Sequence, residues 1–310
     1  MFDKEFITEN QQVFLEELKN TGVELWMKRE DKIHKYVSGN KFRKLKYNIL
    51  EAKRLQKKTI VTFGGAYSNH IVATAVGGNL SNIKTIGIIR GQELADNLNK
   101  VLKENKTLHV AYTNGMQFEF ITREAYRNKN DASFIDNLKE KYGDFYLVPE
   151  GGTNSMAVKG CEEILSTEDQ KFDYICTAVG TGGTIAGLIN AANENQKIIG
   201  FPALKGDFLK NEIVKFTESN RWSLNTDYHF GGYGKFNKEL INFINKFNSE
   251  TGILLDPIYT GKMLYGIVNM ILNKKFEKGS RILAIHTGGL QGIDGFNKKL
   301  QKKNIDLIKV

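Results

Sequence analysis

Six apolar runs alternate along the chain with segments of helical periodicity. The runs are 59–63, 84–89, 144–148, 174–179, 197–201 and 281–285, and helical patterns cover segments such as 69–76 and 132–142. Strands that are apolar throughout and separated by helices are typical of parallel sheets buried on both faces. The pattern therefore predicts an α/β fold of open, mostly parallel twisted sheets with helices on both faces.

Two glycine-rich breaks divide the chain, at Gly64-Gly65 and at Glu150-Gly151-Gly152. They roughly frame a segment of about a hundred residues, which is the size of a small domain. We predict a smaller α/β domain over 51–150 and a larger domain formed by 1–50 and 151–310. Each domain would then contain one of two sheets.

Composition narrows the class of protein. Of the 310 residues, 41% are hydrophobic, and no apolar stretch approaches the roughly 18 residues of a membrane span. The first residues lack the features of a signal peptide, so we expect a cytoplasmic protein.

The two cysteines, Cys161 and Cys176, lie in a predicted helix and a predicted strand and are expected in the core. No His, Cys and carboxylate cluster has metal-ligand spacing, so no metal is predicted.

The net charge of +9 raises the question of nucleic acid. The lysines are spread along the chain, and aromatic residues are not interleaved with them as in a single-strand binding platform. A solvated, lysine-rich surface is the better interpretation, and such a surface would also attract small anionic ligands.

A glycine turn joins the predicted strand 174–179 to an apolar helix. Its residues are Gly180, Thr181, Gly182, Gly183 and Thr184. Converging backbone N–H groups at a helix N-terminus favour a phosphate. Ile185 replaces the third glycine of a dinucleotide fingerprint, and the Lys-Ser/Thr ending of a P-loop is missing, so a phosphate monoester is the remaining ligand. The alternative is a tight turn without a ligand.

Lys41 follows the turn Ser38-Gly39-Asn40 and opens a predicted helix. The helix dipole disfavours a cation in the first turn, and Lys44 lies on the same helix face. Both effects lower the pKa of the Lys41 amine, as a covalently acting lysine requires. Alone, the pattern is more typical of an exposed basic helix face. Because a predicted phosphate site accompanies it, we prefer the interpretation of Lys41 as a covalently acting lysine.

Four ordered motifs resemble a known family. They are Gly39-Asn40-Lys41-Phe42-Arg43-Lys44, Gly64-Gly65-Ala66-Tyr67-Ser68-Asn69-His70, the turn at 180–184, and Asp256-Pro257-Ile258-Tyr259-Thr260-Gly261-Lys262. Over nearly the whole chain they are similar to the 1-aminocyclopropane-1-carboxylate deaminase and D-cysteine desulfhydrase family of fold-type-II pyridoxal-phosphate enzymes, which are tryptophan-synthase-β-like. The resemblance implies pyridoxal 5'-phosphate in a cleft between the larger and the smaller domain.

The resemblance also implies roles for single residues. Lys41 would hold the cofactor and move the Cα proton, and Lys44 would assist at the phosphate, which the turn at 180–184 would bind. Ser68 would meet the substrate and Asn69 the ring oxygen of the cofactor, although both positions also suit helix capping.

Further residues come from the same resemblance. Tyr259 would lie close to the cofactor ring, and Tyr233 would be a second active-site tyrosine. Without the resemblance, both are more often packing residues. For His70, a hydrogen-bonding role in a partly buried position is preferred to acid–base catalysis.

Position 260 separates two activities within the family. The deaminase type has a glutamate here that pairs with the pyridine nitrogen, whereas this chain has Thr260, as in desulfhydrase-type members, and a second hydroxyl at Thr287. A neutral hydroxyl makes a weaker electron sink, which suits loss of a good leaving group better than opening of a cyclopropane. Tyr67, Gly231 and Gly232 depart from the family pattern near the expected substrate site.

The expected reaction is α,β-elimination and deamination of a small amino acid. D-cysteine is the best candidate, giving pyruvate, ammonia and sulfide. The alternatives are 1-aminocyclopropane-1-carboxylate deamination, then racemisation or dehydration of serine-like substrates, or a catalytically inactive homologue that binds the cofactor or a metabolite. Similar enzymes are commonly homodimers, so a homodimer is expected, with no nucleic-acid or membrane partner.

Overall fold

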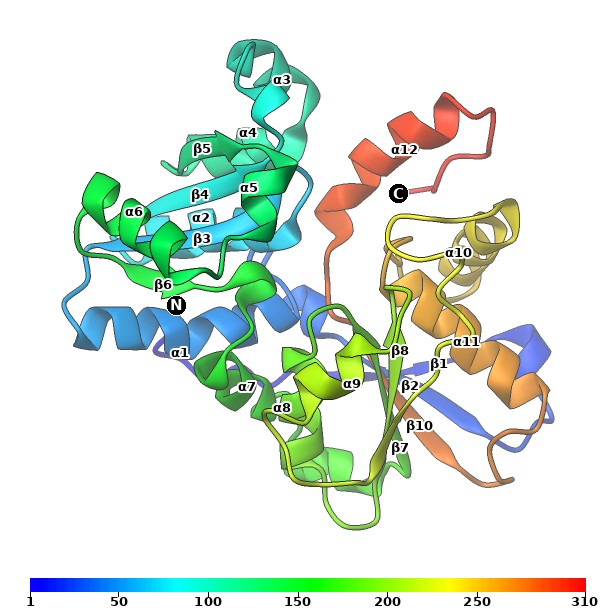
Figure 1. Ribbon diagram of the computed structural model, residues 1–310. Helices are drawn as coiled ribbons and strands as arrows, with labels where there is room; N and C mark the ends of the chain where they lie inside the picture. Colours follow the sequence, from blue (N-terminus) through cyan, green and yellow to red (C-terminus); the bar gives the residue numbers. More distant parts are fainter.

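The computed structural model describes all 310 residues and contains two sheets, each at the centre of one lobe (Figure 1). The larger sheet has the strand order β1 (Asn10–Val13), β2 (Glu24–Lys28), β10 (Arg281–Ile285), β7 (Tyr174–Val179), β8 (Lys197–Pro202) and β9 (Trp222–Leu224). Only β1 is antiparallel to its neighbour. The smaller sheet is fully parallel, in the order β5 (Gln117–Ile121), β4 (Lys84–Arg90), β3 (Thr59–Gly65) and β6 (Tyr146–Val148).

Twelve α-helices surround the sheets. They are α1 (Asn40–Arg54), α2 (Asn69–Leu80), α3 (Leu98–Glu104), α4 (Lys106–Thr113), α5 (Arg123–Arg127), α6 (Ala132–Tyr142), α7 (Ser155–Glu162), α8 (Gly183–Ala191), α9 (Phe208–Ile213), α10 (Lys238–Thr251), α11 (Thr260–Leu272) and α12 (Ile293–Gln301). No helix is both long enough and apolar enough to span a bilayer.

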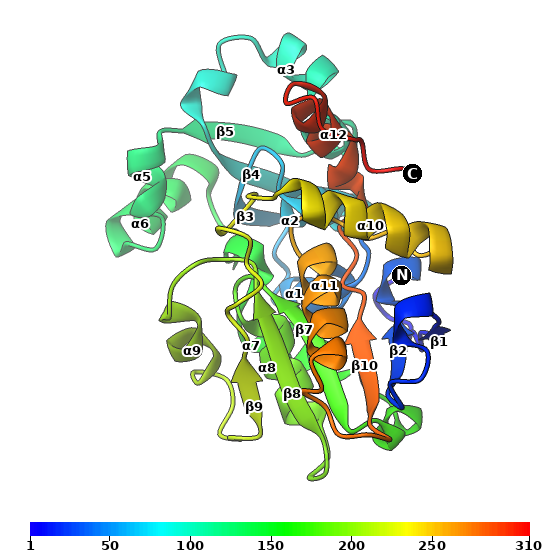
Figure 2. The same ribbon diagram turned by 90° about the vertical axis from the view of Figure 1, so that its right-hand side faces the viewer.

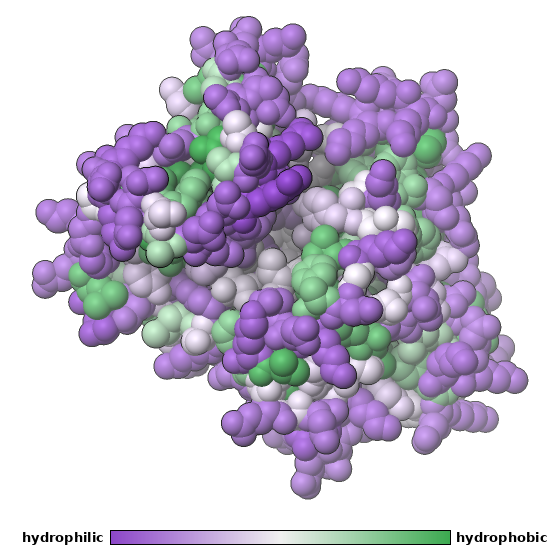
Figure 3. Space-filling model, in the orientation of Figure 1, coloured by the Kyte–Doolittle hydropathy of each residue, from purple (hydrophilic) through white to green (hydrophobic).

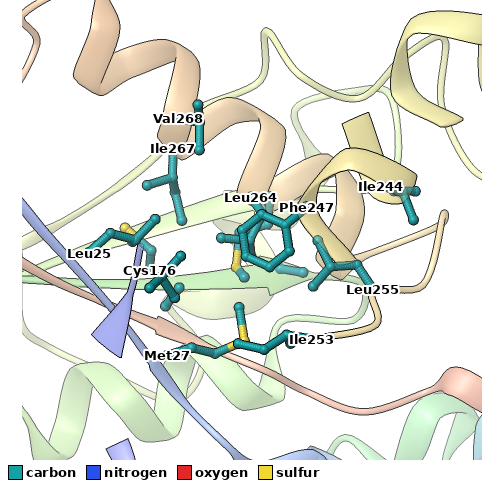
Figure 4. Close-up of a cluster of buried hydrophobic side chains, with 14 of the residues drawn as sticks. Leu25, Met27, Cys176, Ile244, Phe247, Ile253, Leu255, Leu264, Ile267 and Val268 are labelled. Atoms are coloured by element: carbon teal, nitrogen blue, oxygen red, sulfur yellow. The ribbon is translucent and has the colours of Figure 1, made fainter. Parts of the chain in front are cut away.

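The larger sheet is buried on both faces, which explains why its central strands are apolar throughout. Cys176 and Ala178 of β7 pack with α10, α11 and α12, and Figure 4 shows part of this core around Phe247. Ile175 and Val179 of the same strand face α7, α8 and α9 on the other side. Figure 2 shows α11 on one face of the sheet and α8 on the other. The predicted two-sheet α/β architecture with helices on both faces is therefore what the chain forms.

Helix α1 packs between the two lobes. Phe42, Leu45 and Ile49 pack with the smaller sheet, in the same core as Ile60 of β3. On the other side, a Cβ on Gly160 of α7 would lie 1.9 Å from the Arg43 carbonyl oxygen, so only glycine permits this close helix contact. The strands of the smaller sheet lie within the predicted domain 51–150, whereas α1 crosses its boundary at residue 50.

Candidate active site

Two glycine turns, at 180–183 and at 288–289, follow the carboxyl ends of β7 and β10, which are neighbours in the larger sheet. The chain continues from β7 to β8 on one side, while β10 pairs with β2 on the other, so the strand order reverses here. Such a switch point forms a crevice in open α/β sheets, and ligands bind there. In Figure 3 the surface is hollowed between the two lobes.

Lys41 lies in the first turn of α1, at this crevice. Gly39, the residue that precedes α1, has a φ of 58°, and a Cβ on it would lie 2.1 Å from the Thr287 carbonyl oxygen after β10. The start of α1 is thus pressed against the end of β10, which glycine alone permits. The half-buried Lys41 amine has one hydrogen-bond partner, Asn40 Oδ1 at 3.3 Å. Burial and the nearby charge of Lys44 lower its pKa to about 7.

Lys44, one turn further along α1, is almost fully buried. Its Nζ donates to Thr153 Oγ1 at 2.9 Å, Gly151 O at 3.2 Å and Thr181 Oγ1 at 3.3 Å. Burial lowers its pKa to about 8, and no carboxylate is close enough to raise it. A buried ammonium with three neutral oxygen partners lacks a counter-charge, and an anion beside it would supply one.

The N-terminus of α8 adds further donors beside Lys44. Gly182 precedes this helix with a left-handed φ of 88°, and the first turn leaves its N–H groups without partners in the helix. Asn40 Nδ2 donates to Thr184 Oγ1 at 2.8 Å, while Asn40 Oδ1 accepts from Lys41. One asparagine therefore connects the Lys41 amine to the glycine turn. Of the five residues of the predicted phosphate site, Gly180, Thr181 and Gly182 form this turn, and Gly183 and Thr184 are the first two residues of α8.

Ser68 and Asn69 lie at the N-terminus of α2. Ser68 occupies the position before the helix, but its side chain makes no capping hydrogen bond, and a Cβ on Gly64 would lie 3.0 Å from the Ser68 Cβ. The hydroxyl of Ser68 is therefore free for another partner. Asn69 Oδ1 is buried without a hydrogen bond, and Nδ2 lies 3.5 Å from the Gly289 carbonyl oxygen.

His70 is buried behind these residues. Its Nε2 lies 2.8 Å from Thr62 Oγ1, and Thr62 donates its own proton to the Val148 carbonyl oxygen at 2.8 Å. Thr62 must therefore accept from Nε2–H, which leaves Nδ1 as an acceptor without a partner. Burial, with the charges of Lys41 and Lys44, lowers the pKa of His70 well below its ordinary value. The imidazole is neutral and hydrogen-bonded, as preferred from the sequence, and more deeply buried than predicted.

Two tyrosines pack against each other across from the glycine turn. The rings of Tyr233 and Tyr259 are 6.2 Å apart in an edge-to-face arrangement, and a Cβ on Gly180 would lie 3.2 Å from Tyr259 Cε1. Asp256 fixes the backbone of Tyr259 by accepting from its N–H at 2.9 Å and from that of Ile258 at 2.8 Å. Burial raises the pKa of Tyr259 well above 10, so its hydroxyl remains protonated.

Lys262 holds the loop that carries Tyr233. Its buried ammonium donates to the carbonyl oxygens of His229 and Gly232, each at 2.8 Å. Gly231 and Gly232 have φ values of 88° and 109°, which proline cannot adopt. This left-handed backbone favours glycine at both positions, where the chain departs from the family pattern.

Replacing Lys262 with methionine should release the Tyr233 loop, because two carbonyl groups lose their shared donor. We expect kcat/KM to fall by about tenfold or more, together with faster proteolytic cleavage within 229–235. Lys275 is exposed and follows α11, the helix that contains Lys262, so Lys275→Met is the control variant. Unchanged kinetics and unchanged cleavage in Lys262→Met would show that the loop does not depend on this lysine.

The two threonines predicted near the cofactor differ in their partners. Thr260 donates its hydroxyl proton to Asp256 Oδ1 at 2.8 Å and accepts the Asp256 N–H at 2.9 Å. Thr287, directly after His286 at the end of β10, is buried, and its hydroxyl has no hydrogen bond with another residue. Thr260 thus stabilises the turn at 256–260, and Thr287 offers the free hydroxyl.

Polar groups with one weak hydrogen bond or none are therefore gathered in one crevice. They are the Lys41 amine, the Ser68 hydroxyl, Asn69 Oδ1 and the Thr287 hydroxyl, next to the uncompensated Lys44 cation and the start of α8. The fold and these groups define an α/β enzyme that binds a phosphate monoester beside a lysine amine that is partly neutral near pH 7. Pyridoxal phosphate fits this arrangement, because it has an anionic phosphate, a carbonyl that lysine can attack, and polar ring substituents.

Comparison with known proteins gives the family. The model of the family described as pyridoxal-phosphate dependent enzyme matches residues 5–288. The chain is 34% identical to the bifunctional D-cysteine desulfhydrase/1-aminocyclopropane-1-carboxylate deaminase of Arabidopsis thaliana, over 88% of this chain and 74% of the relative. This chain belongs to the pyridoxal-phosphate dependent enzymes, and pyridoxal phosphate is its cofactor.

Other relatives agree with this assignment. The D-cysteine desulfhydrase of Yersinia enterocolitica is 26% identical, with 90% of each chain covered. A crystal structure described as an ACC deaminase homologue superimposes with a TM-score of 0.80 at 30% identity, covering 96% of this chain and 94% of the other. A cystathionine β-synthase from Helicobacter pylori, at 15% identity and a TM-score of 0.67, shares the fold. The predicted fold class is confirmed.

Several residues of the crevice were not among the predicted site residues. Thr153 joins Lys44 and Thr181, and its hydroxyl lies 2.6 Å from Thr181 Oγ1. Gly151 and Gly152, interpreted as a domain break, pack against Thr181 and His70. Tyr67, a departure from the family pattern, packs on α12, where a Cβ on Gly295 would lie 3.2 Å from Tyr67 Cε1.

Proposed function

We propose that this enzyme catalyses α,β-elimination from a small amino acid, with D-cysteine as the best candidate. The observation that carries the proposal is the pair of Lys41 and Thr287: a free amine of lowered pKa and a neutral hydroxyl at the same crevice. Relatives named D-cysteine desulfhydrase support the substrate. Cysteine and water would give pyruvate, ammonia and hydrogen sulfide, so the atoms balance without an oxidant.

The residues around the cofactor would divide its binding among them. Lys41 would hold it covalently, and Lys44, Thr153 and the N-terminus of α8 would bind its phosphate. The site includes the turn residues Gly180, Thr181, Gly182, Gly183 and Thr184. Asn69 would contact the ring oxygen and Tyr259 the ring. When bound, the cofactor supplies an electron sink for the pair released at Cα.

Catalysis itself would depend on side chains of this chain. Ser68, with the free N–H groups at the start of α2, would hold the substrate carboxylate. Lys41 would then take the proton from Cα, a role for which a pKa of about 7 is well matched. Tyr233 and Tyr259 would close the crevice on the other side, and the protonated Tyr259 hydroxyl could donate to the departing thiolate.

Thr287 is the group that we propose beside the ring nitrogen, because the Thr260 hydroxyl is already bound to Asp256 in both directions. A hydroxyl does not keep that nitrogen protonated as a carboxylate would, so stabilisation of the electron pair at Cα is modest. Loss of sulfide from Cβ is compatible with such a sink. Deamination of 1-aminocyclopropane-1-carboxylate is the second candidate, because the Arabidopsis relative is named for both activities.

Valine substitutions should separate the two threonines. Thr260→Val removes two buried hydrogen bonds and should lower the free energy of unfolding by about 1–3 kcal/mol. Thr287→Val should change that free energy by only about 0.5 kcal/mol, yet shift the visible absorbance of the bound cofactor. Denaturant unfolding and absorbance spectra measure both effects. A spectral shift in Thr260→Val alone would contradict the assignment of Thr287.

A product assay tests the proposed reaction. The holoenzyme would be incubated separately with D-cysteine, L-cysteine and 1-aminocyclopropane-1-carboxylate, and sulfide, pyruvate and 2-oxobutyrate would be measured. We expect sulfide and pyruvate in equal amounts from D-cysteine. Formation of 2-oxobutyrate without sulfide would favour the second candidate. Normal cofactor absorbance without product from any amino acid would indicate a protein that binds the cofactor without turnover.

Two further properties belong to the proposal. The cytoplasm is supported by the small number of cysteines, both of which are buried free thiols. We propose a homodimer because similar enzymes are commonly homodimers, and sedimentation of the holoenzyme would test it. The two domains, 51–150 and the remainder, are proposed as units that meet at the crevice.

A further inference from the structure

Arg90, the last residue of β4, is a charged side chain that the proposed reaction does not use. Its guanidinium carbon lies 5.5 Å from the centre of the Tyr126 ring. It is exposed, and it forms neither an ion pair nor a hydrogen bond with any side chain. Stacking on an aromatic ring restricts a guanidinium and leaves its N–H groups directed outwards, which favours binding of an oxyanion.

The surroundings of Tyr126 leave Arg90 as the unpaired cation. The Tyr126 side chain is buried, and Lys129 Nζ also lies 4.8 Å from the centre of its ring. Lys129 forms an ion pair with Glu150 at 3.2 Å. The Glu150 carboxylate is thus already paired with a lysine, and Arg90 has no ion-pair partner.

Arg90 and Ser68 lie at the same edge of the smaller sheet but on different sides of β3. Successive residues of a strand face opposite sides of a sheet. A Cβ on Gly64 would lie 3.0 Å from the Ser68 Cβ, whereas a Cβ on Gly65 would lie 3.7 Å from Arg90 Nη2. The carboxyl end of β3 therefore separates two positions for negative groups, one at Ser68 and one at Arg90.

The charge of Arg90 also reaches the other wall of the crevice. Burial raises the pKa of Tyr233, and Arg90 partly offsets that rise, while Glu150 acts in the opposite direction. In Figure 3 the rim of the hollow on the side of the smaller lobe is strongly hydrophilic. Arg90 is paired with Gly65 across β3 and β4, and the Gly65 carbonyl oxygen accepts from the Ser68 N–H at 3.0 Å. Arg90 therefore lies beside the turn that carries Ser68, at the carboxyl ends of the strands, where the far end of a substrate side chain would lie.

We propose that Arg90 is a specificity-determining residue that binds a second negative group, at the far end of the substrate side chain. The inference rests on the proposed β-elimination and names its substrate class: amino acids whose β-substituent ends in a carboxylate or another oxyanion. In elimination from such a thioether, the Cβ–S bond breaks, the Cα proton passes to Lys41, and the thiolate takes up a proton. With water, the products are pyruvate, ammonia and an anionic thiol, without oxidation or reduction.

A matched pair of substrates tests this role. S-carboxymethylcysteine and S-carbamoylmethylcysteine, each as the D and the L form, have the same size and differ in one charge. For the wild-type holoenzyme, we expect kcat/KM and the dissociation constant from spectral titration to favour the carboxymethyl compound by about tenfold or more. Arg90→Gln should lose most of that preference. Arg123→Gln, an exposed arginine of the same lobe paired with Glu93, should keep it.

The possible results separate this inference from the proposed reaction. Equal values for the two compounds in the wild type would overturn the anion site. An equal loss for both compounds in Arg90→Gln would also overturn it, because Arg90 would then act on the shared α-carboxylate. If no amino acid gives pyruvate, the proposed reaction fails, but a loss of the preference in the dissociation constants of Arg90→Gln would still support the anion site.

Discussion

Replacing Lys41 with alanine is expected to abolish covalent binding of pyridoxal phosphate and to lower kcat/KM by about 10³-fold or more. Two lysines of the crevice have a lowered pKa, but only one has a free amine. The Lys44 ammonium donates to three oxygen atoms, whereas Lys41 Nζ has a single contact at 3.3 Å. With a pKa of about 7, a large fraction of Lys41 is unprotonated at neutral pH and able to attack a carbonyl.

The matched control for this variant is Lys53→Ala, an exposed lysine of the same helix. It should keep both the visible absorbance of the holoenzyme and its activity. In Lys41→Ala, the cofactor should still bind through its phosphate, but without the absorbance of a lysine adduct. Persistence of that absorbance in Lys41→Ala would mean that another lysine holds the cofactor.

Replacing Lys44 with methionine should weaken cofactor binding by about 10²- to 10³-fold. The variant keeps a side chain of similar length but removes the only ammonium that contacts Thr153 and Thr181. The lost interaction is charge-assisted and shielded from water, so its loss is costly. Fluorescence titration of the apoprotein with pyridoxal phosphate measures the affinity, with Lys53→Met as the control. An affinity within about threefold of the wild type would contradict this role, because that difference is only about 0.7 kcal/mol.

The same lysine makes the stability of the apoprotein depend on pH. Its pKa is lowered from 10.5 to about 8, so between these values the unfolded chain binds more protons than the folded chain. The free energy of unfolding therefore rises with pH across this window. Below about pH 8 the folded protein bears the full cost of burying the charged Lys44 amine. Lys44→Met should reduce that slope by up to about 1.4 kcal/mol per pH unit. Denaturant unfolding at several pH values provides the test.

The sequence predicts the six strands that lie in apolar runs, including the edge strand β6, and misses β1, β2, β5 and β9. The strand 174–179 agrees with β7 and the strand 281–285 with β10. In contrast, β1 is a short polar edge strand, and β9 has only three residues. Strands that are short or mix polar with apolar residues lack a clear apolar run, so their formation depends on pairing with a neighbour rather than on their own pattern.

The site could be predicted where glycine and lysine patterns mark it. Residues at 39–44 and 180–184 lie close together in the structure, as Asn40 and Thr184 show. Residues that act through a distant partner carry no such local signal. Thr153 contacts Lys44 across 109 positions of the chain, and Lys262 reaches the Gly232 carbonyl across 30. Only the fold brings these pairs together.

The most direct test of the central claim is the position of the covalently bound cofactor. The holoenzyme would be reduced with borohydride, digested and analysed by mass spectrometry of its peptides. We predict a single phosphopyridoxyl group, on Lys41, in the peptide that spans the start of α1. Modification of Lys44, Lys262 or any other lysine in place of Lys41 would contradict the account.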